Sequence, residues 1–494
     1  MNCLRVAFVV AVCALAACGP PRADRNSARL GIALEPPNLD PTAGAAAAID
    51  EVVYANVFEG LTRIGPNGEV LPALAASWDV SPDGLTYTFH LRANARFHDG
   101  TPFDASDVKF SLDRARAPNS TNAQKALFDP IASVDLVDPS TVRVTLSRPT
   151  SDFLFNMGLG DAVMVAPETA ATNAAKPTGT GPFRFSRWLK GTQIELTRNG
   201  TYWGTPAKLD KLTFLIIPDA SAAYAALLAG DVDSFPNFPA VELLPQIRDD
   251  PRFAIEFGTT EGETILAINN TKPPFNDIRV RRAMSHAIKR SDLIQGVGQG
   301  YGTPIGSHFA PHNKAYVDLT GRYPYDPALA RKLLVEAGHP DGITATLRLP
   351  PVIYARRGGE IIAAQLKAAG IKVTIENIEW AQWLDQVFTR GDFDLTIVAH
   401  TEPNDIGIYA RDDYYFHYAR PAFKDLMAAL ARATTEGERT RILQAAQRML
   451  ADDAVNVFLF QLPKIGVWNR RLHGQWANSP IQANDMTAAY WSKD

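Results

Sequence analysis

Strict alternation of polar and apolar residues marks the clearest strand in the first third of the chain. The run Thr86–Leu91 (TYTFHL) alternates and follows the turn sequence Ser-Pro-Asp-Gly, a combination that predicts a strand. A helix is predicted to follow through residues 110–112, with Asp104 or Ser106 as its cap. Between residues 32 and 146 we therefore expect short strands broken by turns.

Helical spacing of apolar residues becomes the dominant pattern after residue 276. One helix places its apolar residues on a single face and Arg or Lys on the others; the apolar positions are Val280, Ala283, Met284, Ala287 and Ile288. A second helix is predicted to begin at Asp326 and Pro327 and to end at Gly338. Both patterns are typical of amphipathic helices that pack on a core.

Strand and helix patterns then alternate at short spacing. Strands are predicted at 345–349, 371–375 and 393–398, and helices at 359–369 and 380–389. This order favours a parallel sheet, in which ligands bind beyond the carboxyl ends of the strands. The loop 400–418 leaves such an end and is therefore a candidate ligand site. A last helix at 438–449 precedes a strand at 455–460.

The N-terminus has the features of an export signal. Residues 6–14 are apolar, follow Arg5 and are too few to span a bilayer, which predicts a signal peptide over 1–17. The sequence LAACG at 15–19 resembles a bacterial lipobox, so Cys18 is predicted to carry lipid and 18–28 to serve as the lipidated cysteine and tether. The alternative is an ordinary secretory signal that is cut nearby. No later apolar stretch is long enough to predict a transmembrane span.

Composition and motifs exclude several classes of function. The net charge is -4, with 49 Lys and Arg against 53 Asp and Glu and no basic block, which argues against a nucleic-acid binder. All three cysteines lie at or before Cys18, so the mature chain is predicted to have no thiol chemistry. The chain has no nucleophile elbow, zinc-protease motif or phosphate loop, and Pro311 separates His308 from His312. We therefore expect no enzyme activity, no cofactor and no metal site.

Several sequence blocks occur in an order and spacing typical of one protein family. They include NVFEGL at 56–61, FHDGTPF at 97–103, GTGPF at 179–183, YW at 202–203 and PFNDIRVRRA at 274–283. These blocks resemble those of the bacterial oligopeptide-, dipeptide- and nickel-binding proteins, the family 5 solute-binding proteins of peptide-type ABC importers. The resemblance implies an extracytoplasmic protein that closes around a peptide or similar small solute and delivers it to permease subunits. Lipid anchoring would hold a monomer in the periplasm, or on the cell surface of a Gram-positive host.

The resemblance also implies an α/β fold of the two-lobed periplasmic binding protein type (type II, cluster C) with an additional inserted strand-rich domain. Lobe I is expected at 29–68, 178–268 and 465–494, the inserted domain at 69–177, and lobe II at 269–464. The crossovers between lobes are expected near 268–269 and 463–464. Motif residues such as Trp78, Phe97, Asp99 and Gly100 are expected to be structural, since they recur in members with unrelated ligands.

In peptide-binding relatives, an acidic residue that follows a Gly-Trp pair in the sequence, after the strand corresponding to 393–398, receives the ligand's ammonium group. This chain has Ala399-His400 there, and Glu402 and Asp405 are both acidic candidates, a choice that the sequence leaves open. Further ligand-binding candidates are His400, Tyr409, Tyr414, Tyr415 and His417, with Asn38 and Tyr54 by position alone. Core packing is the alternative for the aromatic residues. His400 also leaves open a non-peptide ligand, such as a metal complex, opine, sugar, haem or amino-acid conjugate.

Overall fold

The computed structural model describes residues 26–44, 46–433 and 435–493. The predicted signal peptide and the predicted lipidation site Cys18 lie outside these residues. Among the described residues, no helix combines the length and the apolar character that crossing a bilayer requires.

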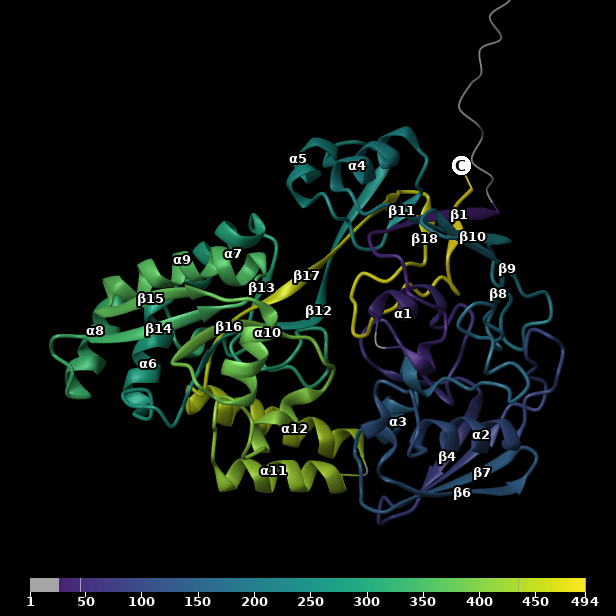
Figure 1. Ribbon diagram of the computed structural model, residues 1–494, viewed down its shortest axis with the longest axis horizontal. Helices are drawn as coiled ribbons and strands as arrows, with labels where there is room; N and C mark the ends of the chain where they lie inside the picture. The colour runs from purple at the N-terminus through teal and green to yellow at the C-terminus, as the bar shows by residue number, and fades with distance from the viewer. Residues whose placement is uncertain (1–25, 45, 434, 494) are drawn as a thin grey trace, which may run out of the picture.

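A mixed sheet of eleven strands connects the two halves of the described chain (Figure 1). Its strands, in spatial order, are β15 (Ile371–Asn377), β14 (Ile343–Leu349), β16 (Leu395–His400), β12 (Phe253–Ile268), β17 (Val457–Asn469), β11 (Ser234–Phe235), β1 (Ser27–Ile32), β10 (Lys211–Ile216), β9 (Gln193–Arg198) and β8 (Phe183–Leu189), with β13 (Thr303–Pro304) paired to β17. β14 runs parallel to β15 and β16, which confirms the parallel arrangement predicted from the alternating strands and helices.

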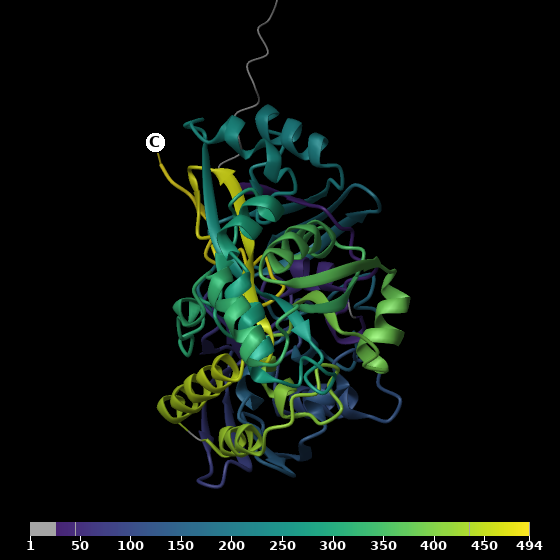
Figure 2. The ribbon, with the colours of Figure 1, turned by 90° about the vertical axis from the view of Figure 1, so that its left-hand side faces the viewer.

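The two long strands β12 and β17 run antiparallel through both halves, and Figure 2 shows them side by side along the molecule. Residues 253–259 of β12 pair with residues 463–469 of β17, whereas residues 263–268 also pair with β16. A register shift separates Thr259 from Glu263 along β12. The residue limits of the lobes, with crossovers expected near 268–269 and 463–464, stay a prediction.

Helices cover the lobes on either side of this long ribbon (Figure 1). In lobe II they are α6 (Ile278–Ala287), α7 (Arg290–Gly298), α8 (Pro327–Glu336), α9 (Ile353–Ala368), α10 (Trp380–Trp383) with a π-helical turn at Leu384–Thr389, α11 (Pro421–Arg432) and α12 (Glu436–Asp452). Lobe I carries α1 (Ala47–Val53), α4 (Ala220–Ala229), α5 (Leu244–Ile247) and the short strand pairs β2 (Thr62–Ile64) with β3 (Val70–Pro72) and β18 (Leu472–His473) with β19 (Tyr490–Trp491). Short 3-10 turns lie at Pro41–Ala43, Lys125–Phe128, Gly160–Ala162, Val241–Leu243, Thr320–Arg322 and Asp405–Ala410.

A separate four-stranded antiparallel sheet forms the inserted part of the fold. Its order is β4 (Ala75–Val80), β5 (Thr86–Leu91), β7 (Thr141–Leu146) and β6 (Ile131–Asp138), with α2 (Ala105–Arg116) and α3 (Phe153–Asn156) beside it. β5 spans the predicted strand, and Asp104 caps α2 as expected: its carboxylate accepts from the Ser106 backbone N–H at 2.7 Å. The Asp107 carboxylate in turn accepts a 2.9 Å hydrogen bond from the Asp104 backbone N–H, which completes a capping box.

Several predicted elements are longer than their sequence patterns indicate, and for two of them the structure shows the reason. The helix expected at 359–369 begins at Ile353, and Gly358 and Gly359 lie inside it. A Cβ on Gly359 would lie 2.3 Å from Leu349 Cδ1, so this glycine allows α9 to pack closely on β14. Gly359 therefore does not mark the start of the helix. The strand expected at 455–460 continues to Asn469 because its second half forms the ribbon with β12.

Candidate functional site

A cavity of about 360 Å³ opens where the lobes face each other. Its walls come from α1, from α3 and the turn Gly160–Ala162 that follows it, from β12 and from the turn after β16. Its acidic lining residues are Asp50, Asp161, Glu261 and Glu402, and the described residues that line it include no Lys, Arg or His. The cavity therefore has a strongly acidic wall.

The β12 register shift accounts for the position of Glu261. This residue lies between the two paired segments of the strand, and such irregularities redirect side chains out of the ladder. Glu261 Oε1 and His312 Nε2 are 2.7 Å apart, and Thr259 Oγ1 lies 2.6 Å from His312 Nδ1. Glu261 is thus held at the cavity wall by a histidine that lies behind it.

The structure separates the two acidic residues that the sequence left equivalent. Glu402 is exposed on the turn after β16 and lines the cavity, where its Oε2 accepts a 3.2 Å bond from the Thr401 N–H. Asp405 faces lobe II instead: its Oδ1 lies 2.7 Å from His308 Nε2 and its Oδ2 lies 3.4 Å from His400 Nδ1. Burial favours a raised pKa for Asp405, but the charges of these histidines and their hydrogen bonds outweigh it and hold the pKa well below its usual range.

His308, His400 and Asp405 have the donor types of a transition-metal site, with ligand atoms within 4.8 Å of one another. In each histidine, however, the imidazole nitrogen that does not contact Asp405 already has a tyrosine hydroxyl as partner. Tyr409 Oη lies 3.1 Å from His308 Nδ1, and Tyr415 Oη lies 3.1 Å from His400 Nε2. All four imidazole nitrogens therefore have a protein oxygen as partner, an arrangement that suits a hydrogen-bonded network inside lobe II.

The aromatic candidates of the 400–418 loop belong to the hydrophobic core of lobe II. Tyr409 and Tyr415 are each 1% exposed, Tyr414 is buried, and none of them lines the acidic cavity. His417 is partly buried with a left-handed backbone, and its N–H donates to the Tyr414 carbonyl at 2.8 Å. These contacts agree with the core-packing alternative, and a ligand role for these residues stays a prediction.

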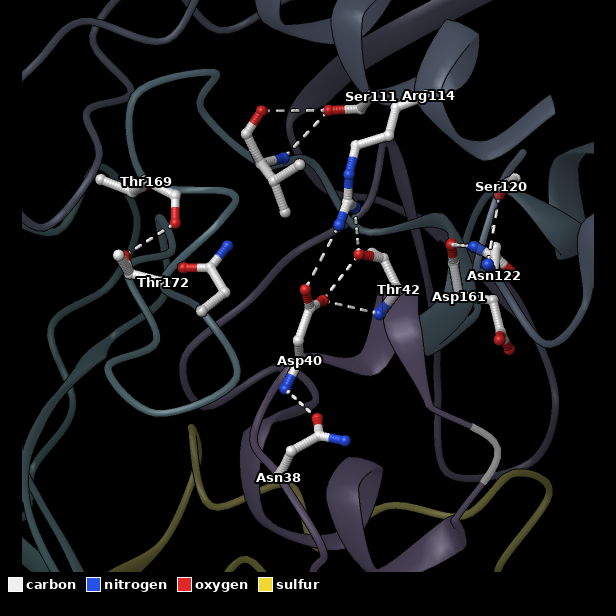
Figure 3. Close-up of polar contacts among 12 residues, drawn as sticks. Asn38, Asp40, Thr42, Ser111, Arg114, Ser120, Asn122, Asp161, Thr169 and Thr172 are labelled. Carbon is white, nitrogen blue, oxygen red and sulfur yellow. Dashed lines mark hydrogen bonds and ion pairs between the residues drawn. The ribbon is translucent and has the colours of Figure 1, made fainter. Parts of the chain in front are cut away.

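The two candidates assigned by position alone have different surroundings. Tyr54 lines the cavity, where its hydroxyl donates to the Gly158 carbonyl at 2.7 Å and accepts from the Ile64 N–H at 3.0 Å. Asn38 does not line it: its Oδ1 accepts from the Asp40 N–H at 2.8 Å, next to the Asp40, Thr42 and Arg114 network in Figure 3. Tyr54 is thus the better placed of the two.

Sequence reasoning missed three of the acidic lining residues: Asp50, Asp161 and Glu261. A signal existed for Glu261, because acidic residues at 261 and 263 precede the apolar run TILAI on a core strand. Glu263 is 2% exposed, its Oε2 has no hydrogen-bond partner, and burial together with the charge of Glu261 raises its pKa well above the usual range. No comparable sequence signal marks Asp50 or Asp161.

Three of the recurrent sequence blocks meet at the buried carboxylate of Glu59. Thr180 Oγ1, Tyr202 Oη and Trp203 Nε1 donate to it at 2.8, 2.7 and 2.8 Å. Glu59 is 5% exposed and none of these four residues lines the cavity. This arrangement is consistent with the expectation that most motif residues support the fold rather than bind the solute.

Comparison with known proteins agrees with the fold and with these blocks. Residues 69–420 match the family model described as bacterial extracellular solute-binding proteins, family 5 Middle. Heme-binding protein A of Haemophilus influenzae is 34% identical over 346 residues, covering 64% of this chain and 63% of that protein, which is just under two thirds of its length. The dipeptide-binding protein of Escherichia coli is 30% identical over 434 residues, covering 78% of this chain and 80% of that protein.

The structure of HbpA2 from Haemophilus parasuis superposes with a TM-score of 0.88 at 26% identity, covering 95% of this chain and 100% of that one. The two-lobed α/β fold implied by the sequence blocks is thereby confirmed. The family consists of substrate-binding transport proteins rather than enzymes. The chain belongs to family 5 of the bacterial extracellular solute-binding proteins, which capture solutes for ABC importers.

Proposed function

We propose that this protein binds a peptide or peptide-like solute in the acidic cavity, with Glu402 receiving the amino terminus of the ligand. One observation carries this assignment: Glu402 borders the cavity, whereas Asp405 is occupied by His308 and His400. A relative named a dipeptide-binding protein supports a peptide as the ligand class.

The chemistry of the ligand explains why an unoccupied acid matters. An ammonium group that loses its water when the lobes close needs a charged partner, and removing one member of such a buried pair costs about 2–5 kcal/mol. Asp405 would have to give up two imidazole partners to supply that charge. Glu402 has only a backbone N–H to release, so its carboxylate is the less costly partner.

The proposal includes the setting of the protein. A periplasmic location follows from the family, and we propose that Cys18 carries the lipid anchor and that the monomer delivers its solute to the permease subunits. Because a myristoyl chain alone binds membranes only weakly, stable anchoring would need more than one acyl chain on that cysteine.

Isolation of the bound solute tests the ligand class. The chain from residue 19 onward is produced without signal and Cys18, and what it retains is released by mild denaturation and identified by mass spectrometry. Short peptides are expected. Calorimetry with an identified peptide then compares wild type with Glu402→Gln and with the control Glu360→Gln, which changes an exposed glutamate on α9. Unchanged affinity in Glu402→Gln would remove the assignment of Glu402.

A non-peptide ligand is the second candidate. The observations that favour it are a relative named heme-binding protein A and the donor types of His308, His400 and Asp405. To hold a metal, these three residues would have to exchange their present hydrogen-bond partners for it. A single defined non-peptide molecule, or metal present at one equivalent and lost with chelator, would support this alternative and would exclude the peptide.

A further inference from the structure

The acidic wall carries more carboxyl groups than a ligand amino terminus requires. Glu402 lies on the turn after β16 in lobe II, and Glu261 lies on the long strand β12. On the opposite wall, Asp50 comes from α1 and Asp161 from the turn Gly160–Ala162. No basic side chain among the described lining residues balances them. A ligand carboxylate would find no cationic partner on this wall, whereas a second cationic group would find a pair of carboxylates.

Asp50 has an unused hydrogen-bond acceptor. Its Oδ1 is inaccessible to water and has no hydrogen-bond partner. The carboxylate sits directly over Gly160, where a Cβ would lie 2.1 Å from Oδ1, so only glycine leaves room for it. A buried acceptor without a partner destabilises a fold. Such a group needs a structural explanation, and Asp50 lines the cavity, where a ligand can supply a donor to its carboxylate.

Asp161 is the second carboxylate of this wall and lies within electrostatic range of Asp50. Its backbone carbonyl accepts a 2.8 Å hydrogen bond from Asn122 Nδ2, which fixes the turn, and in Figure 3 its carboxylate points away from Asn122. Burial and the charge of Asp161 raise the pKa of Asp50 well above its usual range, and burial raises the pKa of Asp161 to about 6. A positive charge placed between the two would relieve both effects.

We propose that Asp50 and Asp161 form a subsite for a second positive charge, so that the solute is a peptide with a lysine or arginine side chain as well as a free amino terminus. This inference rests on the proposed peptide-binding function and names the ligand class of the same cavity. Glu402 takes the amino terminus, and the Asp50–Asp161 pair takes the ammonium or guanidinium group. The Asp50 carboxylate accepts one of its N–H groups.

The subsite has a consequence for the pH dependence of binding. In the free protein both carboxyls hold protons more strongly than ordinary aspartates do, and a bound cation favours their ionised forms. Binding of a basic peptide therefore releases protons, and its affinity falls as the pH drops through about 6. The neighbouring Glu51 adds negative charge near Asp50, and the positive charge of Lys464 favours the ionised form of Glu51. Glu261 and Glu402 face Asp50 and Asp161 across the cavity.

Selection from a peptide mixture tests the subsite. The protein is incubated at pH 7.5 with an equimolar mixture of tripeptides, and the retained peptides are sequenced by mass spectrometry. Wild type is expected to enrich Lys- and Arg-containing tripeptides over Met- and Leu-containing ones by about tenfold or more. Asp161→Asn and Asp50→Asn are expected to lose this preference, while Asp341→Asn, an exposed aspartate in lobe II, keeps it.

The outcomes separate this inference from the proposed function. Tripeptides retained without preference for basic side chains would overturn the subsite and leave the peptide function standing. The protein could instead retain no tripeptide but bind 1,5-diaminopentane, with this binding lost in Asp161→Asn. That result would overturn the peptide function and support a cation subsite. Preference that survives in both variants would overturn the assignment of these two residues. Thermal unfolding of each variant verifies that it is folded.

Discussion

Replacing Asp405 by asparagine is expected to destabilise lobe II, whereas Glu402→Gln is expected to weaken ligand binding without changing stability. The two acids lie three residues apart, but Asp405 accepts from His308 at 2.7 Å and lies 3.4 Å from His400, while Glu402 is exposed at the cavity. Urea unfolding followed by tryptophan fluorescence measures the effect. Trp383 is a suitable reporter because it is 5% exposed and its ring centroid lies 5.9 Å from that of Tyr415, the partner of His400.

The magnitude follows from the two contacts. A hydrogen bond to a charged group contributes about 1.5–3 kcal/mol, and the 3.4 Å contact to His400 contributes less because it is long. Removing the buried negative charge also leaves the two histidines without an anionic acceptor. We therefore expect Asp405→Asn to lower the free energy of unfolding by about 3 kcal/mol.

The pH dependence has a definite sign. The folded-state pKa of Asp405 lies below the ordinary value of 3.8, so its ionised form stabilises the native state. This contribution is present above the unfolded-state pKa and is lost as the pH falls below it toward the folded-state pKa. The difference between wild type and Asp405→Asn is therefore expected to shrink below a pH of about 4.

Two controls make this prediction refutable. Glu402→Gln and Glu360→Gln both change exposed glutamates and are expected to unfold within about 0.5 kcal/mol of wild type. If Asp405→Asn unfolds at the same urea concentration as wild type, the histidines do not depend on it. If, in addition, only this variant loses ligand, Asp405 rather than Glu402 receives the amino terminus.

Three further substitutions test other parts of the structure. Asp161→Asn is expected to stabilise the ligand-free protein by up to about 3 kcal/mol at pH 7.5 and not at pH 4. Burial raises the folded-state pKa of Asp161 from 3.8 to about 6, so its ionisation lowers the stability of the wild type as the pH rises between these values. Thermal unfolding at both pH values measures this difference. Glu59→Ala removes the acceptor of three donors, of which Thr180 is buried and Tyr202 and Trp203 are partly buried, and is expected to cost more than about 3 kcal/mol. Circular dichroism during urea unfolding measures this cost, and a loss below about 1 kcal/mol would contradict the structural role of Glu59. Gly359→Ala introduces a Cβ that would lie 2.3 Å from Leu349 Cδ1 and is expected to cost about 1–3 kcal/mol. Gly437→Ala serves as its control in the same assay, because beyond the neighbouring residues and backbone of its own helix no atom lies within 4 Å of the added Cβ.

The sequence determined the features that depend on local pattern. Polar and apolar alternation predicted β5, and the spacing of apolar residues predicted α6. Asp104 was a candidate cap because a short acidic side chain can satisfy the first N–H groups of the helix within a few residues. Such contacts lie within one turn or one strand, so the linear sequence contains all the information they need. The sequence blocks likewise identified the family, because their order along the chain is itself a sequence property.

The tertiary structure decided which residues face the solute. His308 and Asp405 are separated by 97 residues, and their contact removes Asp405 from the acids available to a ligand. Asp50 and Asp161 come together only because α1 packs beside the turn Gly160–Ala162, and nothing in the local sequence of either residue indicates that neighbour. Burial, orphaned acceptors and shifted pKa values arise from packing between distant segments. For this reason the sequence could name Glu402 and Asp405 as equals, and only the folded chain could tell them apart.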